Sequence, residues 1–148
     1  MLKIREAVKT DLKQLVELYT QLHNNTMPKF DDRLEKLWAD ILDDKNHHVL
    51  VGVVGNKIVS SLVIIIVPNL THEQRPYALC ENVITHFEHR NRGYAMKLLD
   101  FAKAIAEKEN CYKIMLMTGS KNKKVLSFYE NAGYNREDKT AFIKWLNR

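Results

Sequence analysis

The stretch of sequence that decides the fold reads Glu81-Asn82-Val83-Ile84-Thr85-His86-Phe87-Glu88-His89-Arg90-Asn91-Arg92-Gly93-Tyr94-Ala95-Met96. It begins as an apolar strand, continues as a basic turn and ends as the start of a helix. The first N–H groups of a helix lack partners within the helix, and the helix dipole helps them to bind anions. Gly93 allows an anion to approach the main chain, and Arg90, Arg92 and Lys97 add positive charge. The stretch therefore predicts a diphosphate site, although a capped surface helix with solvated arginines is the alternative.

Apolar periodicity places further elements on both sides of this stretch. Asp11 is a candidate N-cap of a helix, strengthened by Gln14, while Gly55-Asn56 predicts a tight hairpin and Gly133 a helix C-cap. The predicted strands cover residues 2–8, 48–54, 58–67, 77–85, 113–118 and 140–146, with one more left open around Tyr134. The predicted helices cover residues 11–22, 34–42, 93–109 and 123–132.

This order of elements, β-α-α-β-β-β-α-β-α-β, predicts an α/β fold in which helices flank a single mixed sheet. No Gly, Ser or Pro-rich linker divides the chain and no internal repeat is visible. We therefore expect residues 1–148 to form one domain, since the length is typical of a single domain.

Composition narrows the class of partner. The chain is 45% hydrophobic and 28% charged, with a net charge of +5 that suggests an anionic partner: nucleic acid, a membrane surface or a phosphorylated cofactor. Cys80 and Cys111 match no metal or redox spacing, so we expect no metal and a reducing, cytoplasmic setting. The first residues carry no secretory signal, and the longest apolar run, 62–67, is too short to cross a bilayer. We therefore expect a soluble protein without a membrane partner.

Two motifs resemble the GNAT superfamily of N-acetyltransferases. Arg90-x-x-Gly93-x-Ala95 after an apolar strand is similar to that family's Gln/Arg-x-x-Gly-x-Gly/Ala signature. Downstream, Asn122-x-x-Val125-x-x-Phe128-Tyr129-Glu130-Asn131-Ala132-Gly133-Tyr134 is similar to its Asn-x-x-Ala-x-x-Leu/Phe-Tyr-x-x-x-Gly-Phe/Tyr segment. The order and separation agree, and the likeness covers residues 77–145. Shorter likenesses point to glucosamine-phosphate and aminoalkylphosphonate N-acetyltransferases.

The resemblance implies a mostly antiparallel sheet with two splayed central parallel strands, and acetyl-coenzyme A as co-substrate without a metal. The pantetheine arm would pair with the main chain of one of these strands, and the pyrophosphate would bind at the following turn. The cofactor-binding residues carried over are Val83, Ile84, Thr85, Asn91, Arg92, Gly93, Tyr94, Ala95, Met96 and Asn122. Asn122 has an alternative role as the cap of the helix that starts at Lys123.

The resemblance also implies that Tyr129 protonates the departing thiolate, although a packing role on an apolar helix face is the alternative. A neutral amine must be formed for the reaction, and Glu81 is the first candidate for the general base. His86 is a second candidate, and a surface or salt-bridged carboxylate is the other interpretation of Glu81.

The expected function is direct transfer of an acetyl group from acetyl-coenzyme A to a primary amine of a small molecule. Acetylation of a protein or peptide amine, and a non-catalytic acetyl-coenzyme A sensor, are alternatives. A nucleic-acid-binding module is a remote alternative, because the basic residues cluster beside the cofactor motifs and no aromatic–basic interleaving is present. A homodimer is left open, and segments 23–32 and 69–75, expected to line the acceptor pocket, show no signature.

Overall fold

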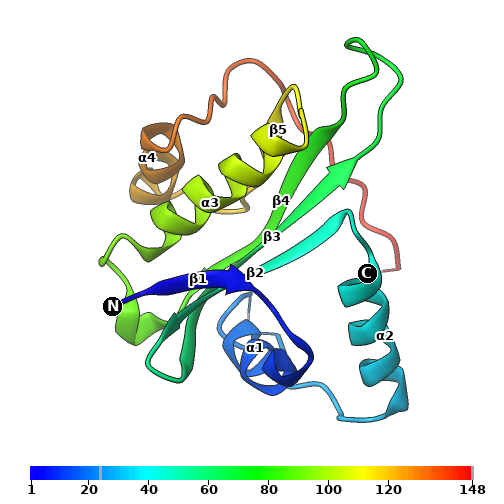
Figure 1. Ribbon diagram of the computed structural model, residues 1–148. Helices are drawn as coiled ribbons and strands as arrows, with labels where there is room; N and C mark the ends of the chain where they lie inside the picture. Colours follow the sequence, from blue (N-terminus) through cyan, green and yellow to red (C-terminus); the bar gives the residue numbers. More distant parts are fainter. Residues whose placement is uncertain (24, 148) are drawn as a thin grey trace. The chain divides into compact units, whose positions relative to one another are not determined.

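The computed structural model describes residues 1–23 and 25–147, so residue 24 of the predicted acceptor segment lies outside the described residues (Figure 1). The chain divides into two compact units, Met1–Leu116 and a second that begins at Met117. None of the described helices is long and apolar enough to span a membrane.

The first unit is built on a five-stranded sheet in the order β1-β2-β3-β4-β5 (Figure 1). Neighbouring strands are antiparallel, except that β4 and β5 run parallel. The strands are β1 (Lys3–Glu6), β2 (His47–Val54), β3 (Lys57–Val67), β4 (Tyr77–Thr85) and β5 (Ile114–Leu116). The mixed sheet and its parallel pair confirm the predicted fold class.

Helices cover both faces of this sheet. The α-helices of the first unit are α1 (Leu12–Tyr19), α2 (Asp32–Asp43) and α3 (Tyr94–Lys108), and two short 3-10 helices are η1 (Lys9–Asp11) and η2 (Phe87–His89). Figure 1 shows α1 and α2 on one side of the sheet and α3 on the other. The second unit contains α4 (Lys123–Asn131).

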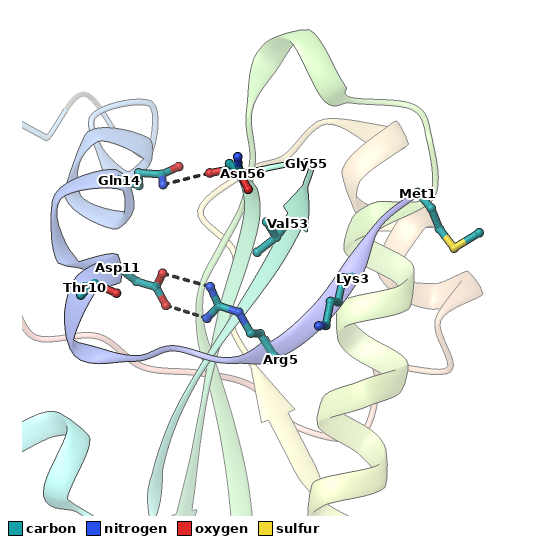
Figure 2. A pocket seen from close by; sticks show the side chains of 9 residues that line it. All are labelled: Met1, Lys3, Arg5, Thr10, Asp11, Gln14, Val53, Gly55 and Asn56. Carbon is teal, nitrogen blue, oxygen red and sulfur yellow. Dashed lines mark hydrogen bonds and ion pairs between the residues drawn. The ribbon is translucent and has the colours of Figure 1, made fainter.

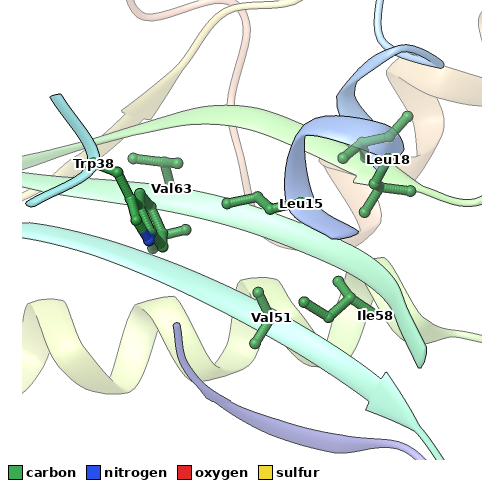
Figure 3. Packing of buried hydrophobic residues seen from close by; sticks show 8 residues of the cluster. Leu15, Leu18, Trp38, Val51, Ile58 and Val63 are labelled. Carbon is green, nitrogen blue, oxygen red and sulfur yellow. The ribbon is translucent and has the colours of Figure 1, made fainter. Parts of the chain in front are cut away.

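A hydrophobic cluster joins α1 and α2 to their face of the sheet (Figure 3). Its buried members are Leu15, Leu18, Trp38, Val49, Val51, Ile58, Val63 and Ile84. Burying one such side chain fully contributes about 1.5–3 kcal/mol. Trp38 also donates from its indole nitrogen to the Lys9 carbonyl at 3.0 Å, so burial leaves this N–H satisfied.

The hairpin between β2 and β3 has the predicted two-residue turn. Val54 and Lys57 pair at its base, and Gly55 takes a φ of 60°, which glycine adopts without steric cost. The predicted C-cap glycine is likewise confirmed in the second unit, where Gly133 has a φ of 95° and donates to the Glu130 carbonyl at 2.9 Å.

The predicted cap of the first helix is wrong. Asp11 stands at the N-cap position of α1, but its side chain makes no cap hydrogen bond there: its carboxylate binds the Arg5 guanidinium at 2.6 and 3.0 Å (Figure 2) and accepts from the Val8 N–H at 2.8 Å. Gln14 instead accepts from the Ile58 N–H at 2.8 Å and donates to the Asn56 carbonyl at 3.1 Å. Asp11 thus ties η1 to β1, and Gln14 ties α1 to the β2–β3 hairpin, which lies far away in sequence. The pattern of a helix start does not reveal either contact.

The strand predicted at 140–146 is also wrong, since residues 140–146 form no strand in the structure and none forms around Tyr134. Strand propensity alone does not create a strand when no neighbouring strand pairs with the segment. Several of its apolar side chains are exposed, with Phe142 93% and Leu146 79% accessible.

Candidate functional site

The C-terminal half of β4 has a strand neighbour on one side only. The parallel pairing runs from Ala78 opposite Ile114 to Cys80 opposite Leu116, where β5 ends. Beyond Cys80, β4 continues to Thr85 along β3, and no strand of the described residues pairs with its other edge. An extended chain can therefore find main-chain hydrogen-bonding groups along this edge.

The end of β4 is held in place by side chains from both directions. The Ser60 hydroxyl on β3 donates to the Ile84 carbonyl at 3.0 Å and lies 2.9 Å from the Thr85 hydroxyl. Arg90, five residues after β4 ends at Thr85, donates through Nε to the Thr85 carbonyl at 3.1 Å. The predicted residues Val83, Ile84 and Thr85 thus lie on a well-anchored strand end.

The turn that follows leads into α3 through two left-handed residues. Asn91 has a φ of 60° and Gly93, the N-cap residue of α3, a φ of 78°. No side-chain cap bonds to this N-terminus in the structure described, so the N–H groups of Tyr94, Ala95 and Met96 remain available to a ligand. Apart from Gly93 and its two chain neighbours, the described residues place no heavy atom within 4 Å of the position that a Cβ on Gly93 would take, which leaves open space above the turn.

Positive charge surrounds this turn. Arg90, Arg92 and Lys97 are exposed, and Arg92 makes only a long contact of 3.4 Å with the Glu88 carbonyl. The free first-turn N–H groups, the open approach at Gly93 and these cations together suit a diphosphate. The predicted residues 91–96 therefore form the turn into α3 and its first helical residues, shortly after β4 ends.

The two candidate bases, Glu81 and His86, have different surroundings. It is exposed on β4 and pairs with Val63, so its side chain lies on the α1/α2 face of the sheet. His86 accepts the Glu88 N–H through Nδ1 at 3.2 Å, and burial is the main cause that lowers its pKa. A neutral His86 in this arrangement carries its proton on Nε2, so neither ring nitrogen has a lone pair left for a substrate proton.

Sequence analysis missed a β-bulge beside Glu81. On β3 one residue separates the pairs Ser61–Ile84 and Val63–Glu81, whereas on β4 two residues separate them. Asn82, one of the two, has a φ of 53°. An asparagine within an apolar strand pattern is the signal that could have predicted this bulge, because strands disfavour it and left-handed residues favour it.

Two polar side chains accompany the α1/α2 cluster. Tyr19 on α1 packs against it, and burial is the dominant cause that raises the pKa of its hydroxyl. The buried Ser61 hydroxyl on β3 donates to the Leu50 carbonyl at 2.8 Å. These polar groups cross the sheet face where the α1/α2 cluster lies.

The second unit holds the remaining predicted residues on α4. Asn122 is the N-cap of α4 and accepts the Lys124 N–H at 2.8 Å, so the capping alternative is correct as a structural role. Tyr129 lies in the last turn, its ring edge-on to Phe128 at 5.1 Å, and its carbonyl accepts the Tyr134 N–H at 3.0 Å. Asn122 and Tyr129 therefore lie at the start and in the last turn of α4 in the second unit. The predicted residues of β4 and of the turn into α3 lie in the first unit.

A separate polar cavity of about 480 Å³ lies near the β2–β3 hairpin and includes none of the predicted site residues (Figure 2). The Arg5–Asp11 ion pair and Lys3 line it. Among the described residues, no group of three or more His, Cys, Asp or Glu side chains is placed to hold a metal ion.

The sequence and fold of this chain are similar to those of known proteins. A model of the acetyltransferase (GNAT) family matches residues 12–134. A putative acetyltransferase from Agrobacterium tumefaciens is 33% identical, with a TM-score of 0.89 over 97% of this chain and 99% of that one. No curated protein matches.

Two more distant structures share the fold. Glucosamine-6-phosphate N-acetyltransferase from Arabidopsis thaliana is 20% identical, with a TM-score of 0.87 over 100% of this chain and 99% of that one. A ribosomal-protein-alanine N-acetyltransferase from Brucella melitensis is 16% identical, with a TM-score of 0.76 over 98% and 100%. The names of these two enzymes specify a small-molecule and a protein acceptor, so the shared fold does not identify the acceptor of this chain.

Proposed function

This chain belongs to the GNAT family of acetyltransferases, and we propose that it transfers the acetyl group of acetyl-coenzyme A to the primary amine of a small molecule. The observation that carries the proposal is the uncapped, open N-terminus of α3 at Gly93, directly after a strand whose second edge is unpaired in the described residues. We further propose that residues 1–148 act as one domain in the cytoplasm; in support, the family match spans both compact units.

The residues at this turn fit the cofactor. The first-turn N–H groups and Arg92 would hold the diphosphate, and the main chain of residues 83–85 would pair with the pantetheine arm. Asn122 would contact the arm in addition to capping α4. When bound, acetyl-coenzyme A supplies the acetyl carbon and a thiolate leaving group.

Three groups of this chain would act in the transfer. Glu81 would accept a proton from the amine, whose pKa of about 10.4 keeps it charged at neutral pH. The N–H of Val83 would donate to the thioester oxygen as negative charge develops there. Tyr129 would give its hydroxyl proton to the departing sulfur; with pKa values of about 10 for tyrosine and 8.5 for a thiol, this step needs local stabilisation of the phenolate.

The acceptor is proposed to be a small amine that carries phosphate, phosphonate or carboxylate, supported by the net charge of +5. The test is a panel of glucosamine 6-phosphate, aminoethylphosphonate, amino acids, polyamines and peptides, each mixed with protein and acetyl-coenzyme A and followed by thiol release. Turnover of a small anionic amine supports the proposal. Acetylation of peptides alone would replace it with a protein acceptor, and tight cofactor binding without turnover on any amine would indicate a sensor.

We also propose that two copies associate through residues 140–146. Phe142, Ile143 and Leu146 are exposed by 93%, 59% and 79%, and monomeric proteins seldom gather so many exposed apolar side chains in one short segment. Light scattering should give twice the chain mass, and Phe142→Asp should shift it to the mass of one chain. A monomeric mass for the unmodified protein would contradict this proposal.

A further inference from the structure

The sheet face that carries Glu81 is only partly covered over β4 and β5. Successive side chains of a strand point to opposite faces, so Tyr77 and Leu79 lie on the same face as Glu81. Met115 on β5 pairs with Leu79 and therefore shares this face. Leu79 and Met115 are half-buried, and Glu81 is exposed. This part of the sheet thus offers a small apolar floor with the proposed base at one end.

A lysine stands at the other end of this floor. Lys113 directly precedes β5, and its carbonyl accepts the Ala78 N–H at 3.0 Å. Its Nζ lies 5.2 Å from the centre of the Tyr77 ring and 5.3 Å from that of Tyr112. The two rings meet edge-on at 6.3 Å, and the His72 imidazole stacks on Tyr112 at 3.9 Å. Two aromatic rings therefore hold the ammonium, and such rings attract a cation without neutralising its charge.

The charge of this ammonium is not matched by a carboxylate. Within residues 1–23 and 25–147, none of the ion pairs involves Lys113, and its Nζ donates no hydrogen bond. An ammonium has three N–H donors, so these remain for a ligand. Lys113 is half-buried, and water and salt screen a half-buried charge less than a fully exposed one. The position therefore suits an anionic group.

The length of the floor limits which molecules can use both of its ends. The pairing of β4 with β3 is regular from Tyr77 to Glu81, which places their Cα atoms about 13 Å apart. Both charged side chains are several bonds long, so the distance between their ends is shorter than this. With Nζ held beside Tyr77, an α-amino acid, whose amine and carboxylate share one carbon, covers the least of this distance. An amine with a more distant anion covers more of it.

We propose that Lys113, held by Tyr77 and Tyr112, binds the anionic group of the acceptor while Glu81 faces its amine. The middle of the acceptor would lie over the apolar floor, which suits a sugar ring or an alkyl chain. Lys113 thereby determines specificity for an amine that carries its phosphate or phosphonate several bonds away. This inference rests on the proposed acetyltransferase function and names the group that recognises the anion within it. The alternative is that Lys113 only fastens the loop before β4 to β5.

Two acceptors that differ only in the anion separate these roles, because specificity is a difference between two affinities. We would compare the anionic amine that the unmodified protein acetylates fastest with the same amine lacking the anion, as in glucosamine 6-phosphate and glucosamine. Lys113→Met keeps an unbranched side chain that can pack on the rings, and it removes the charge. The KM for the anionic amine should rise about 10–100-fold, the effect of one lost charge-assisted hydrogen bond. The KM for the neutral amine should change less than about twofold.

Two further variants serve as controls. Lys113→Arg keeps the charge and should hold the KM for the anionic amine within about fivefold. Lys103→Met removes a lysine that pairs with Glu107 on the exposed surface of α3, and it should leave both KM values unchanged. An equal rise of both KM values in Lys113→Met would assign Lys113 to fastening the loop and overturn the proposal. Unchanged KM values in that variant would overturn it as well.

Binding without turnover distinguishes failure of this inference from failure of the proposed function. In a ¹H–¹⁵N spectrum of the protein without acetyl-coenzyme A, glucosamine 6-phosphate should move the backbone signals of Tyr77 and Lys113, and glucosamine should not. The shifts should disappear in Lys113→Met and persist in Lys103→Met. Unmoved signals in the unmodified protein would overturn the anion site. Moved signals in a protein that acetylates no amine would support the anion site and overturn the proposed function.

Discussion

Replacement of Gly93 by aspartate tests the proposed diphosphate site. The new Cβ would meet no atom within 4 Å, so the protein can accommodate the side chain, but it must be held at a φ of 78°. A non-glycine residue in the left-handed region costs about 1–2 kcal/mol, at the lower end for Asp and Asn. The variant should therefore fold, with a Tm a few degrees lower.

The effect on binding follows from charge. A carboxylate about 5 Å from a phosphate charge costs roughly 0.8 kcal/mol in a fully water-like dielectric and several times more near a protein surface. Two charges on the diphosphate bring the lower bound to about 1.6 kcal/mol, which weakens binding at least about tenfold.

Gly93→Asn is the matched control, since it has the same size and the same tolerance of the backbone without the charge. Calorimetry should show Gly93→Asp at least about tenfold weaker for acetyl-coenzyme A than Gly93→Asn, with the gap narrowing as salt rises. Equal affinities of folded aspartate and asparagine variants would refute the placement of the diphosphate at this turn.

Tyr129→Phe should lower kcat by about 10²–10⁴-fold in a pre-steady-state assay and leave the Kd for acetyl-coenzyme A within about threefold; a kcat within twofold when chemistry limits the rate would assign Tyr129 to packing. Glu81→Gln should lower kcat/KM for the amine most at pH 7 and progressively less towards pH 10, where the free amine loses its proton in solution; a loss independent of pH would argue against a base. The hydrogen bond from Arg5 is the main cause that lowers the pKa of Asp11, so its stabilisation is complete above the unfolded pKa of about 3.9 and is lost as pH falls through the folded pKa. Urea unfolding should show Asp11→Asn less stable than the unmodified protein by about 2–3 kcal/mol at pH 7, with this difference shrinking as pH falls below about 3.9, and the exposed Asp40→Asn serves as a near-neutral control; a loss that does not change with pH would contradict this.

The elements that local pattern predicts well are those with long apolar periodicity. The strands and helices from residue 47 to residue 108 lie within a few residues of the predicted ranges, because their apolar faces pack on one sheet. The turn at Gly93 was also predictable, because glycine and a basic helix start form a local signal.

Features that depend on contacts between distant residues were not predictable from pattern. The pair Asp11 and Gln14 looks like a helix start along the sequence, but Gln14 binds the backbone of Asn56 and Ile58, more than forty residues away. The strand predicted at 140–146 required a pairing partner that local propensity does not supply. The bulge on β4 depends on its register with β3, so the asparagine at residue 82 was the one local sign of it.

Transfer of a labelled acetyl group tests the central claim most directly. The protein is mixed with acetyl-coenzyme A carrying ¹³C in its acetyl group and with the amine panel, and the products are identified by mass spectrometry. We predict a ¹³C-acetylated amine formed in equal amount to released thiol, only when protein, thioester and amine are all present. Thiol release without any acetylated amine, or no release with the whole panel, would contradict the account.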